Sequence, residues 1–289
     1  MKKMFATMLA LSMCLSLAAC GPKSSASTSG SSAGTSASSA GTSASSASGS
    51  QTAASDVDYV KEKGTLIVGI TDFAPMDYKA EGSDEWIGFD ADMAKAFAES
   101  LGVEVEFLEI NWDNKALELE NKGVDAVWNG MTLTDDVKAL MATSDPYCLN
   151  GQVVVLSADV ADQYQTAESL SGLSFAVENG SAGMEQAEAA GLDYVAMDTQ
   201  AKALMEVASG TSDAAIIDLL MAVAMVGEGT SYPDLTYTVQ LSSDEYGVGF
   251  RKGSDLAEAF SSFWKEAYDA GTVMEIAEKY GIQDVMIEK

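Results

Sequence analysis

From Gly64 onward, the chain alternates between short apolar runs and longer amphipathic segments. The run TLIVGIT at 65–71 is continuously apolar, which is typical of a buried parallel strand. The next long segment, 89–102, carries a large apolar residue at every fourth position and ends in glycine, which predicts a helix. The same reasoning predicts strands at 103–110 and 124–130 and helices at 115–123 and 135–141. Strands that alternate with helices favour a parallel sheet covered by helices.

The alternation starts again after Pro146, which excludes helix at that point. In the second part we predict strands at 152–156, 173–178, 194–198, 214–218, 237–241 and 246–250, and helices at 181–191, 199–209, 219–229, 256–271 and 273–281. Two α/β units with a long tail that can return to the first unit suggest two lobes. The chain would then cross between the lobes twice, near 149–153 and near 240–244.

The N-terminus has the pattern of an export signal. Lys2 and Lys3 precede an apolar run that ends in Leu-Ala-Ala-Cys, with small residues before Cys20. We therefore expect a signal peptide at 1–19 and lipidation of Cys20, since this ending resembles a bacterial lipobox. An uncleaved anchor helix is the alternative. The protein would be exported and lipid-anchored on the outer face of the bacterial cytoplasmic membrane.

Residues 20–55 are rich in Ser, Ala, Gly and Thr, and SSAGTSA at 31–37 is repeated at 38–44. Nothing in this segment can bury a core, so it is expected to act as a flexible tether. Removal of Cys14 with the signal and lipidation of Cys20 would leave Cys148 as the only free cysteine. An intramolecular disulfide is therefore not expected.

Charge and composition exclude several classes of function. The formal net charge of −28 argues against nucleic-acid binding, which needs a basic surface. The chain contains no histidine, so Ser-His-Asp and Cys-His catalysis and the common zinc sites are excluded. We expect no catalytic residues, no cofactor and no metal.

A set of short motifs occurs in order along almost all of the globular part. They are VGI (68–70), PMDY (75–78), GFDAD (88–92), DAVWNGMTLT (125–134), SDPY (144–147), NGS (179–181), DAAIID (213–218) and YGVGFRKGSDL (246–256). No single motif is specific, but the ordered set resembles the polar amino-acid type (family 3) of solute-binding proteins that serve ABC importers.

This resemblance implies a type II periplasmic-binding-protein fold. Lobe 1 would comprise 56–150 and 243–289, and lobe 2 would comprise 151–242, each a mainly parallel sheet flanked by helices, with two hinge crossings. It also implies a monomer that captures an amino acid or related small polar solute for the permease subunits of an ABC importer. Closure of the lobes would bury the ligand.

The resemblance also implies a ligand site at the carboxyl ends of the strands. The expected lining residues are Asp72, Phe73, Trp112, Asn129, Gly130, Met131, Thr132, Val137, Gly180, Ser181, Ala182 and Asp218. Trp112 and Phe73 would form aromatic walls, and Asp218 would hold the ligand ammonium group. The N–H groups of 181–183, at a helix N-terminus, would hold an anionic group. Asp90 is interpreted as a cap of the helix 89–102, and Asp218 could instead cap 219–229.

One position departs from the family pattern. Family members commonly carry arginine three residues after the second threonine of T-x-T, where this chain has Val137. Lys138 follows but should point about 100° away on a helix. Arg251, the only arginine, is expected to be structural. A neutral or cationic ligand is therefore favoured, because a second ligand carboxylate would find no cation.

Two other functions remain open from the sequence. One is a ligand-sensing module for a membrane signalling partner, which this sequence distinguishes poorly from an import protein. The other is an exported lyase or hydrolase on the same fold, since folds host unrelated activities. Its acid and base candidates would be Asp72, Asp145 and Asp218, but no nucleophile motif accompanies them.

Overall fold

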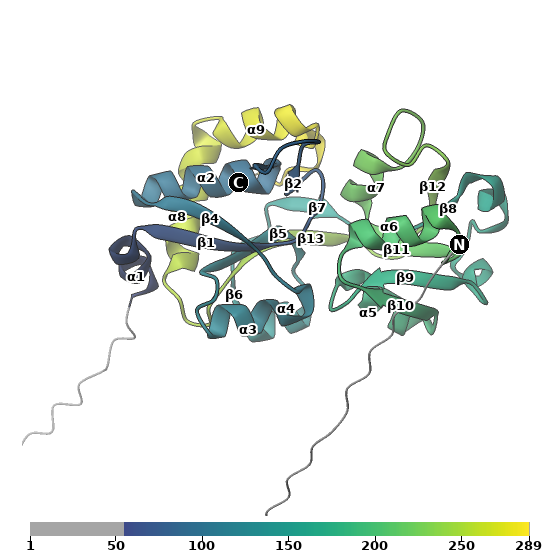
Figure 1. The fold of residues 1–289 in the computed structure, drawn as a ribbon. Coiled ribbons are helices and arrows are strands. Elements are labelled where there is room, and N and C mark those ends of the chain that lie inside the picture. Colours follow the sequence, from purple (N-terminus) through teal and green to yellow (C-terminus); the bar gives the residue numbers. More distant parts are fainter. Residues whose placement is uncertain (1–54, 289) are drawn as a thin grey trace, which may run out of the picture. The chain divides into compact units, whose positions relative to one another are not determined.

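The computed structural model describes residues 55–288. These residues form two α/β lobes, each built on its own mixed sheet (Figure 1). The expected signal peptide, the expected lipidation site at Cys20 and nearly all of the expected tether lie outside the described residues. No helix within the described part is long and apolar enough to span a membrane.

Lobe 1 contains a six-stranded sheet. Its strands in spatial order are β4 (Glu104–Glu109), β1 (Thr65–Ile70), β5 (Ala126–Thr132), β13 (Asp244–Phe250) and β6 (Ala142–Thr143), with β7 (Cys148–Asn150) also paired to β13. β1 is parallel to β4 and β5, whereas β13 is antiparallel to β5. The carboxyl ends of β1 and β5 therefore meet at the same edge of the sheet.

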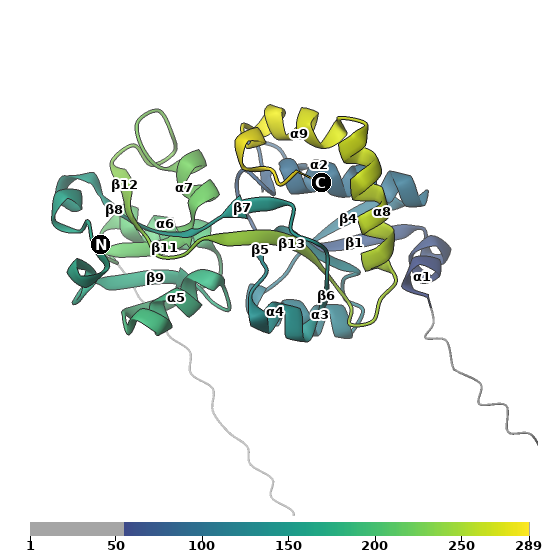
Figure 2. The same ribbon diagram turned by 180° about the vertical axis from the view of Figure 1, so that it is seen from behind.

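Helices cover both faces of this sheet (Figures 1 and 2). On one face lie α2 (Phe89–Leu101), α8 (Leu256–Asp269) and α9 (Thr272–Tyr280), and on the other lie α3 (Lys115–Glu120) and α4 (Asp135–Leu140). Smaller elements of this lobe are α1 (Asp56–Lys63), the hairpin of β2 (Tyr78–Lys79) and β3 (Trp86–Ile87), and short 3₁₀ helices at Trp112–Asn114 and Gln283–Val285.

Lobe 2 contains a five-stranded sheet. Its strands in spatial order are β10 (Asp193–Met197), β9 (Ser174–Glu178), β11 (Ala214–Asp218), β8 (Gln152–Ser157) and β12 (Leu235–Gln240). The helices are α5 (Ala182–Ala190), α6 (Gln200–Ser209) and α7 (Leu219–Met225), with 3₁₀ helices at Ala158–Gln163 and Ala167–Leu170. β9 is parallel to β10 and β11, so the ends of β9 and β11 lie together.

Two crossings connect the lobes, as the sequence predicted. The first passes through Gly151, between β7 and β8, and the second through 241–243, between β12 and β13 (Figure 2). They lie side by side, because the Leu241 N–H donates to the Gln152 carbonyl at 2.7 Å. A side chain at Gly151 would lie 2.4 Å from the Ser242 carbonyl oxygen, so the close contact of the crossings requires glycine there.

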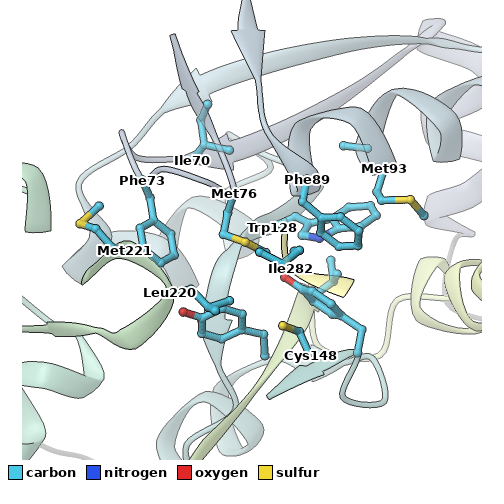
Figure 3. Packing of buried hydrophobic residues seen from close by; sticks show 14 of the residues in the cluster. Ile70, Phe73, Met76, Phe89, Met93, Trp128, Cys148, Leu220, Met221 and Ile282 are labelled. Atoms are coloured by element: carbon cyan, nitrogen blue, oxygen red, sulfur yellow. The ribbon is translucent and has the colours of Figure 1, made fainter. Parts of the chain in front are cut away.

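The largest apolar cluster lies on the α2, α8 and α9 face of lobe 1 and continues into lobe 2. Its centre is aromatic: the ring centroids of Trp128 and Phe260 are 5.0 Å apart in an edge-on arrangement. Figure 3 shows Leu220 and Met221 of α7 near Phe73 of lobe 1, in the same buried cluster. The lobes therefore share apolar contact close to the crossings.

Some local predictions differ from the structure. The helix predicted at 219–229 ends at Met225, because Gly227 and Gly229 adopt left-handed φ angles of 107° and 85°. The helix α1 was not predicted. Ser55, expected in the tether, is its N-cap: its hydroxyl accepts from Asp58 N–H and donates to Asp255.

Candidate functional site

A cavity of about 280 Å³ lies between the lobes, where the carboxyl ends of the parallel strands face each other. Lobe 1 lines it with Thr71, Phe73, Trp112, Asp113, Lys115, Ala116, Asn129, Gly130, Met131, Thr132, Thr134, Asp136, Val137, Leu140 and Met141. Lobe 2 lines it with Glu178, Gly180, Ser181, Ala182, Met184, Glu185, Glu188, Gln200 and Asp218. We refer to this cavity as the cleft.

Nearly all residues predicted for the site line this cleft. They are Phe73, Trp112, Asn129, Gly130, Met131, Thr132, Val137, Gly180, Ser181, Ala182 and Asp218. Asp72 is the exception, because its exposed side chain lines a separate groove with Tyr78, Met225 and Tyr280. Successive residues of an extended segment point to opposite sides, so Phe73 faces the cleft while Asp72 faces away from it.

The side chain of Asn129 is fully engaged inside lobe 1. Its Oδ1 accepts from the N–H and the hydroxyl of Thr71 at 3.0 and 2.8 Å. Its Nδ2 donates to the Thr71 carbonyl and to Asp77 Oδ2 at 3.0 and 2.8 Å. Asn129 therefore fixes the segment after β1 in place, and its amide has little capacity left for a ligand.

The ring of Phe73 leaves no room for a side chain at position 130, so this residue must be glycine. It has a φ of 54°, and a side chain there would come within 2.2 Å of the Phe73 ring. Its N–H donates to Asp90 Oδ2 at 2.6 Å, so this donor is also occupied. Gly130 thus lets an aromatic wall lie against the end of β5.

The interpretation of Asp90 as a helix cap is wrong. The N-cap of α2 is Gly88, and the Asp90 carboxylate points into the core, where it also accepts from the Tyr147 hydroxyl at 2.8 Å. Burial raises the pKa of Asp90 to about 7, although the bonds from Gly130 and Tyr147 oppose this rise. Asp90 therefore holds the backbone of Gly130, which lines the cleft, from the core side of lobe 1.

Val137 and Trp112 form an apolar wall of lobe 1. Both belong to a small buried cluster that includes Met131 and Met141. Thr134 caps α4 as predicted, since its hydroxyl accepts from the Val137 N–H at 3.3 Å. Lys138 is exposed and is not among the residues that line the cleft, so it does not replace the missing arginine.

The N-terminus of α5 opens onto the cleft, but it offers fewer donors than predicted. Ser181 is the N-cap, its hydroxyl accepts from Met184 N–H, and its own N–H donates to the Glu178 carbonyl at 3.3 Å. The N–H groups of Ala182 and Gly183 lie in the first turn, where helices provide no internal acceptor. These two groups and the positive end of the helix favour an anionic group there.

Asp218 ends β11 and precedes α7, but its side chain makes no capping bond. Its Oδ1 accepts from Asn150, Gln152 and Tyr246, and its Oδ2 accepts from Gln200. Burial raises the pKa of Asp218 to about 6, against the effect of the bonds from Gln200, Tyr246 and Gln152. Because Asn150 and Tyr246 come from lobe 1, Asp218 also ties the lobes together.

Lys115 and Gly180 bring the lobes into contact at the cleft. Lys115 Nζ donates to the Gly180 carbonyl at 2.8 Å and to the Trp112 carbonyl at 3.2 Å. A side chain on Gly180 would meet the Asp113 Cα at 2.7 Å. Burial lowers the pKa of Lys115, although Glu178, Asp113 and Glu185 oppose that effect. Lys115 was not predicted, because its position in the short helix α3 gives no sequence signal.

The sequence interpretation also missed Glu178, which is 2% exposed at the end of β9. Its position at the carboxyl end of a parallel strand, two residues before Gly180, could have identified it.

The cleft is strongly acidic. Of the described side chains that line it, Asp113, Asp136, Glu178, Glu185, Glu188 and Asp218 carry carboxyl groups, and only Lys115 is basic. Arg251 lies elsewhere, buried against Asp56 at 3.0 Å and two backbone carbonyls, which confirms its expected structural role.

Comparison with known proteins agrees with this architecture. A family model described as bacterial extracellular solute-binding proteins, family 3, matches residues 66–283. The L-cystine-binding protein TcyJ of Escherichia coli K12 is 30% identical over 230 residues, which cover 78% of this chain and 86% of TcyJ. The arginine-binding extracellular protein ArtP of Bacillus subtilis is 29% identical over 290 residues, covering 97% of this chain and 98% of ArtP.

Among solved structures, a mutant of ArgBP from T. maritima superposes with a TM-score of 0.72 and 34% sequence identity. The match covers 78% of this chain and 98% of that one. The similarity therefore extends over both lobes.

Proposed function

Because this chain belongs to the family 3 bacterial extracellular solute-binding proteins and captures a small polar solute for an ABC importer, we propose that its ligand is a cationic or neutral amino acid. We further propose that the ligand lies in the cleft between the two lobes. The binding of arginine by ArtP and of cystine by TcyJ, as their names state, is consistent with a ligand of this class.

The excess of carboxyl groups in the cleft is the main support for a cationic or neutral ligand. Among the described residues, six carboxyl side chains and a single lysine line it, and Val137 occupies the position where the family arginine would pair with a ligand carboxylate. An anionic ligand would have to leave water for a site of its own charge, which costs free energy that no second cation offsets. A cation finds complementary charge in the same site.

The single carboxylate of an ordinary amino acid still has a place in this cleft. We propose that it lies at the start of α5, where Ala182 lines the cleft and the N–H groups of Ala182 and Gly183 have no acceptor within the helix. Lys115, at the contact between the lobes, would add a positive charge. Trp112 and Phe73 would then enclose the aliphatic part of the ligand.

Titration calorimetry of the purified protein with L-arginine, L-citrulline and L-glutamate tests this proposal. We expect L-arginine to bind at least about 100-fold more tightly than L-glutamate, which corresponds to roughly 2.7 kcal/mol. L-citrulline, which has nearly the shape of arginine without its side-chain charge, should lie between them. Tight binding of L-glutamate, with weaker binding of both others, would contradict the proposed ligand class.

The same titration on Val137→Arg isolates the effect of the missing arginine. Because Val137 lines the cleft, arginine at this position should strengthen binding of L-glutamate by roughly tenfold, the value of a charge-assisted hydrogen bond. Lys138→Arg, an exposed change one residue away that adds no charge, is the control. An unchanged L-glutamate affinity in Val137→Arg would show that this side chain does not reach the ligand.

We also propose that the protein is lipid-anchored through Cys20, acts as a monomer and is not an enzyme. Export follows from the family, and the sequence before Cys20 supports the anchor. Cys20→Ala should release the protein from the membrane fraction in the producing bacterium, because removal of the acyl chains removes their apolar burial. A variant that still sediments with membranes, while wild-type protein also does so, would contradict the anchor.

A further inference from the structure

Glu178 has an unusual environment for a buried carboxyl group. It ends β9, lines the cleft and is 2% exposed. Its Oε1 is fully buried and has no hydrogen-bond partner among the described residues. Leaving a buried acceptor unpaired costs roughly 1–3 kcal/mol, so such an atom usually has a partner. An unpaired acceptor on the wall of a ligand cavity indicates that the ligand supplies the donor.

The neighbouring carboxylate, Asp218, is in the opposite situation. Three donors converge on its Oδ1 and one on its Oδ2. A carboxylate has about four acceptor directions, so its capacity is close to filled by the protein itself. Asp218 therefore organises the base of the cleft and has little left for a ligand cation.

Lys115 does not neutralise Glu178 by direct pairing. Its Nζ donates to the Gly180 and Trp112 carbonyls and lies 5.1 Å from the centre of the Trp112 ring. No ion pair within 4.0 Å joins Lys115 to a carboxylate in the described part of the chain. Within the described part of the chain, Lys115 therefore does not supply the donor that Glu178 Oε1 lacks.

We propose that Glu178 accepts the ammonium or guanidinium group of the bound amino acid, and that Asp218 mainly holds the lobes and the cleft base in place. This inference rests on the proposed function and adds the residue that selects for a cation. The pairing would bury a charge-assisted hydrogen bond between the lobes, where it is stronger than in water.

Binding of a ligand cation by Glu178 is coupled to the loss of a proton from this carboxyl group. The groups that act on Glu178 are Asp218 from β11, Lys115 from α3, Gln200 from α6 and Thr71 from the segment after β1. Burial and then the charge of Asp218 raise the pKa of Glu178 to about 8, against the opposing effects of the other three. At pH 7 the free protein holds the proton, and an arriving cation releases it to solvent as the carboxylate forms.

Titration calorimetry with L-arginine at pH 7, in two buffers of different ionisation enthalpy, tests this exchange. The wild type should release up to about one proton per ligand, and its affinity should rise with pH up to about 8. Glu178→Gln keeps the shape and removes the charge, so it should bind L-arginine at least about tenfold more weakly, without this proton release. Glu168→Gln, an exposed change of lobe 2 outside the cleft, should behave like the wild type.

L-Citrulline identifies which ligand group pairs with Glu178. Loss of affinity for L-arginine alone in Glu178→Gln assigns the side-chain cation, and an equal loss for both ligands assigns the α-ammonium group. If the wild type binds L-arginine and Glu178→Gln binds it as tightly with the same proton release, the role of Glu178 is wrong and the proposed function stands.

The pH dependence of thermal stability, measured without ligand, tests the role of Glu178 independently of the proposed ligand class. Between pH 4.5 and about 8, the folded protein keeps a proton on Glu178 that the unfolded chain has released. The thermal stability of the wild type should therefore fall relative to Glu178→Gln as the pH rises through this window. If the thermal stabilities of the wild type and Glu178→Gln changed with pH in the same way, the inference would be overturned, even if no amino acid tested were found to bind.

Discussion

Gly180→Ala is expected to weaken ligand binding by roughly 10- to 100-fold, because the added methyl group obstructs closure of the lobes. A Cβ at this position would lie 2.7 Å from the Asp113 Cα, a backbone atom of the opposite lobe. Overpacking of this kind costs about 1–3 kcal/mol, and the clash exists only when the lobes are together. The closed state would therefore lose population, and a ligand that needs this state would bind more weakly.

Gly191→Ala provides a matched control. Gly191 ends α5, the helix that begins just after Gly180, and has a similar φ of 64°, compared with 71°. A Cβ on Gly191 would meet no atom within 4 Å. Both variants should lose thermal stability because alanine disfavours left-handed backbone, but only Gly180→Ala should lose affinity. Equal affinities of the two variants in calorimetry would exclude a role for this contact in closure.

Arg251→Met is expected to lower the free energy of unfolding by about 3–5 kcal/mol while leaving ligand affinity unchanged. Arg251 is 9% exposed and donates to Asp56, Leu119 and Val124, and its guanidinium lies 3.5 Å from Asp125. Methionine fills much of the space but leaves Asp56 and Asp125 without this partner. Lys252→Met, an exposed neighbour, should change the free energy by less than about 0.5 kcal/mol.

The pH dependence of unfolding gives an independent check on Arg251. Burial alone would raise the pKa of Asp56, but the bond and the charge of Arg251, with Ser254 and Lys122, lower it overall. A lowered pKa stabilises the fold above its ordinary value of 3.8, and this stabilisation is lost as the pH falls through the folded-state value. Arg251→Met should show a smaller loss than the wild type in this acidic range, measured by chemical denaturation.

The position of Val137 links the ligand proposals to the sequence. At that position the family pattern would place a cation, and the chain instead has a short apolar side chain that lines the cleft. Without the arginine, carboxyl groups outnumber basic groups among the described residues that line the cleft, and Oε1 of Glu178 has no hydrogen-bond partner there. A positively charged group on the ligand would balance the excess of carboxyl groups and would supply the hydrogen-bond donor that Glu178 Oε1 lacks.

The sequence by itself determined most of the helices and the longer strands of the two sheets, and their order. Apolar periodicity and glycine C-caps located helices such as α2 and α5, since these signals act within a few residues. The resemblance to the solute-binding family implied that Asn129 and Asp218 line the cleft, in keeping with ligand sites near the carboxyl ends of parallel strands. The motif order then identified the family, and with it the two lobes and their two crossings.

Only the tertiary structure decided what each cleft side chain is free to do. The sequence cannot show that Asn129 is occupied by Thr71 and Asp77, or that Asp218 is surrounded by four donors from distant segments. Nor can it show that Lys115 reaches the Gly180 carbonyl across 65 positions. These partners come together through sheet order and the contact between lobes. The hydrogen-bonding capacity left for a ligand is what remains after those contacts form, and at this cleft it includes Oε1 of Glu178.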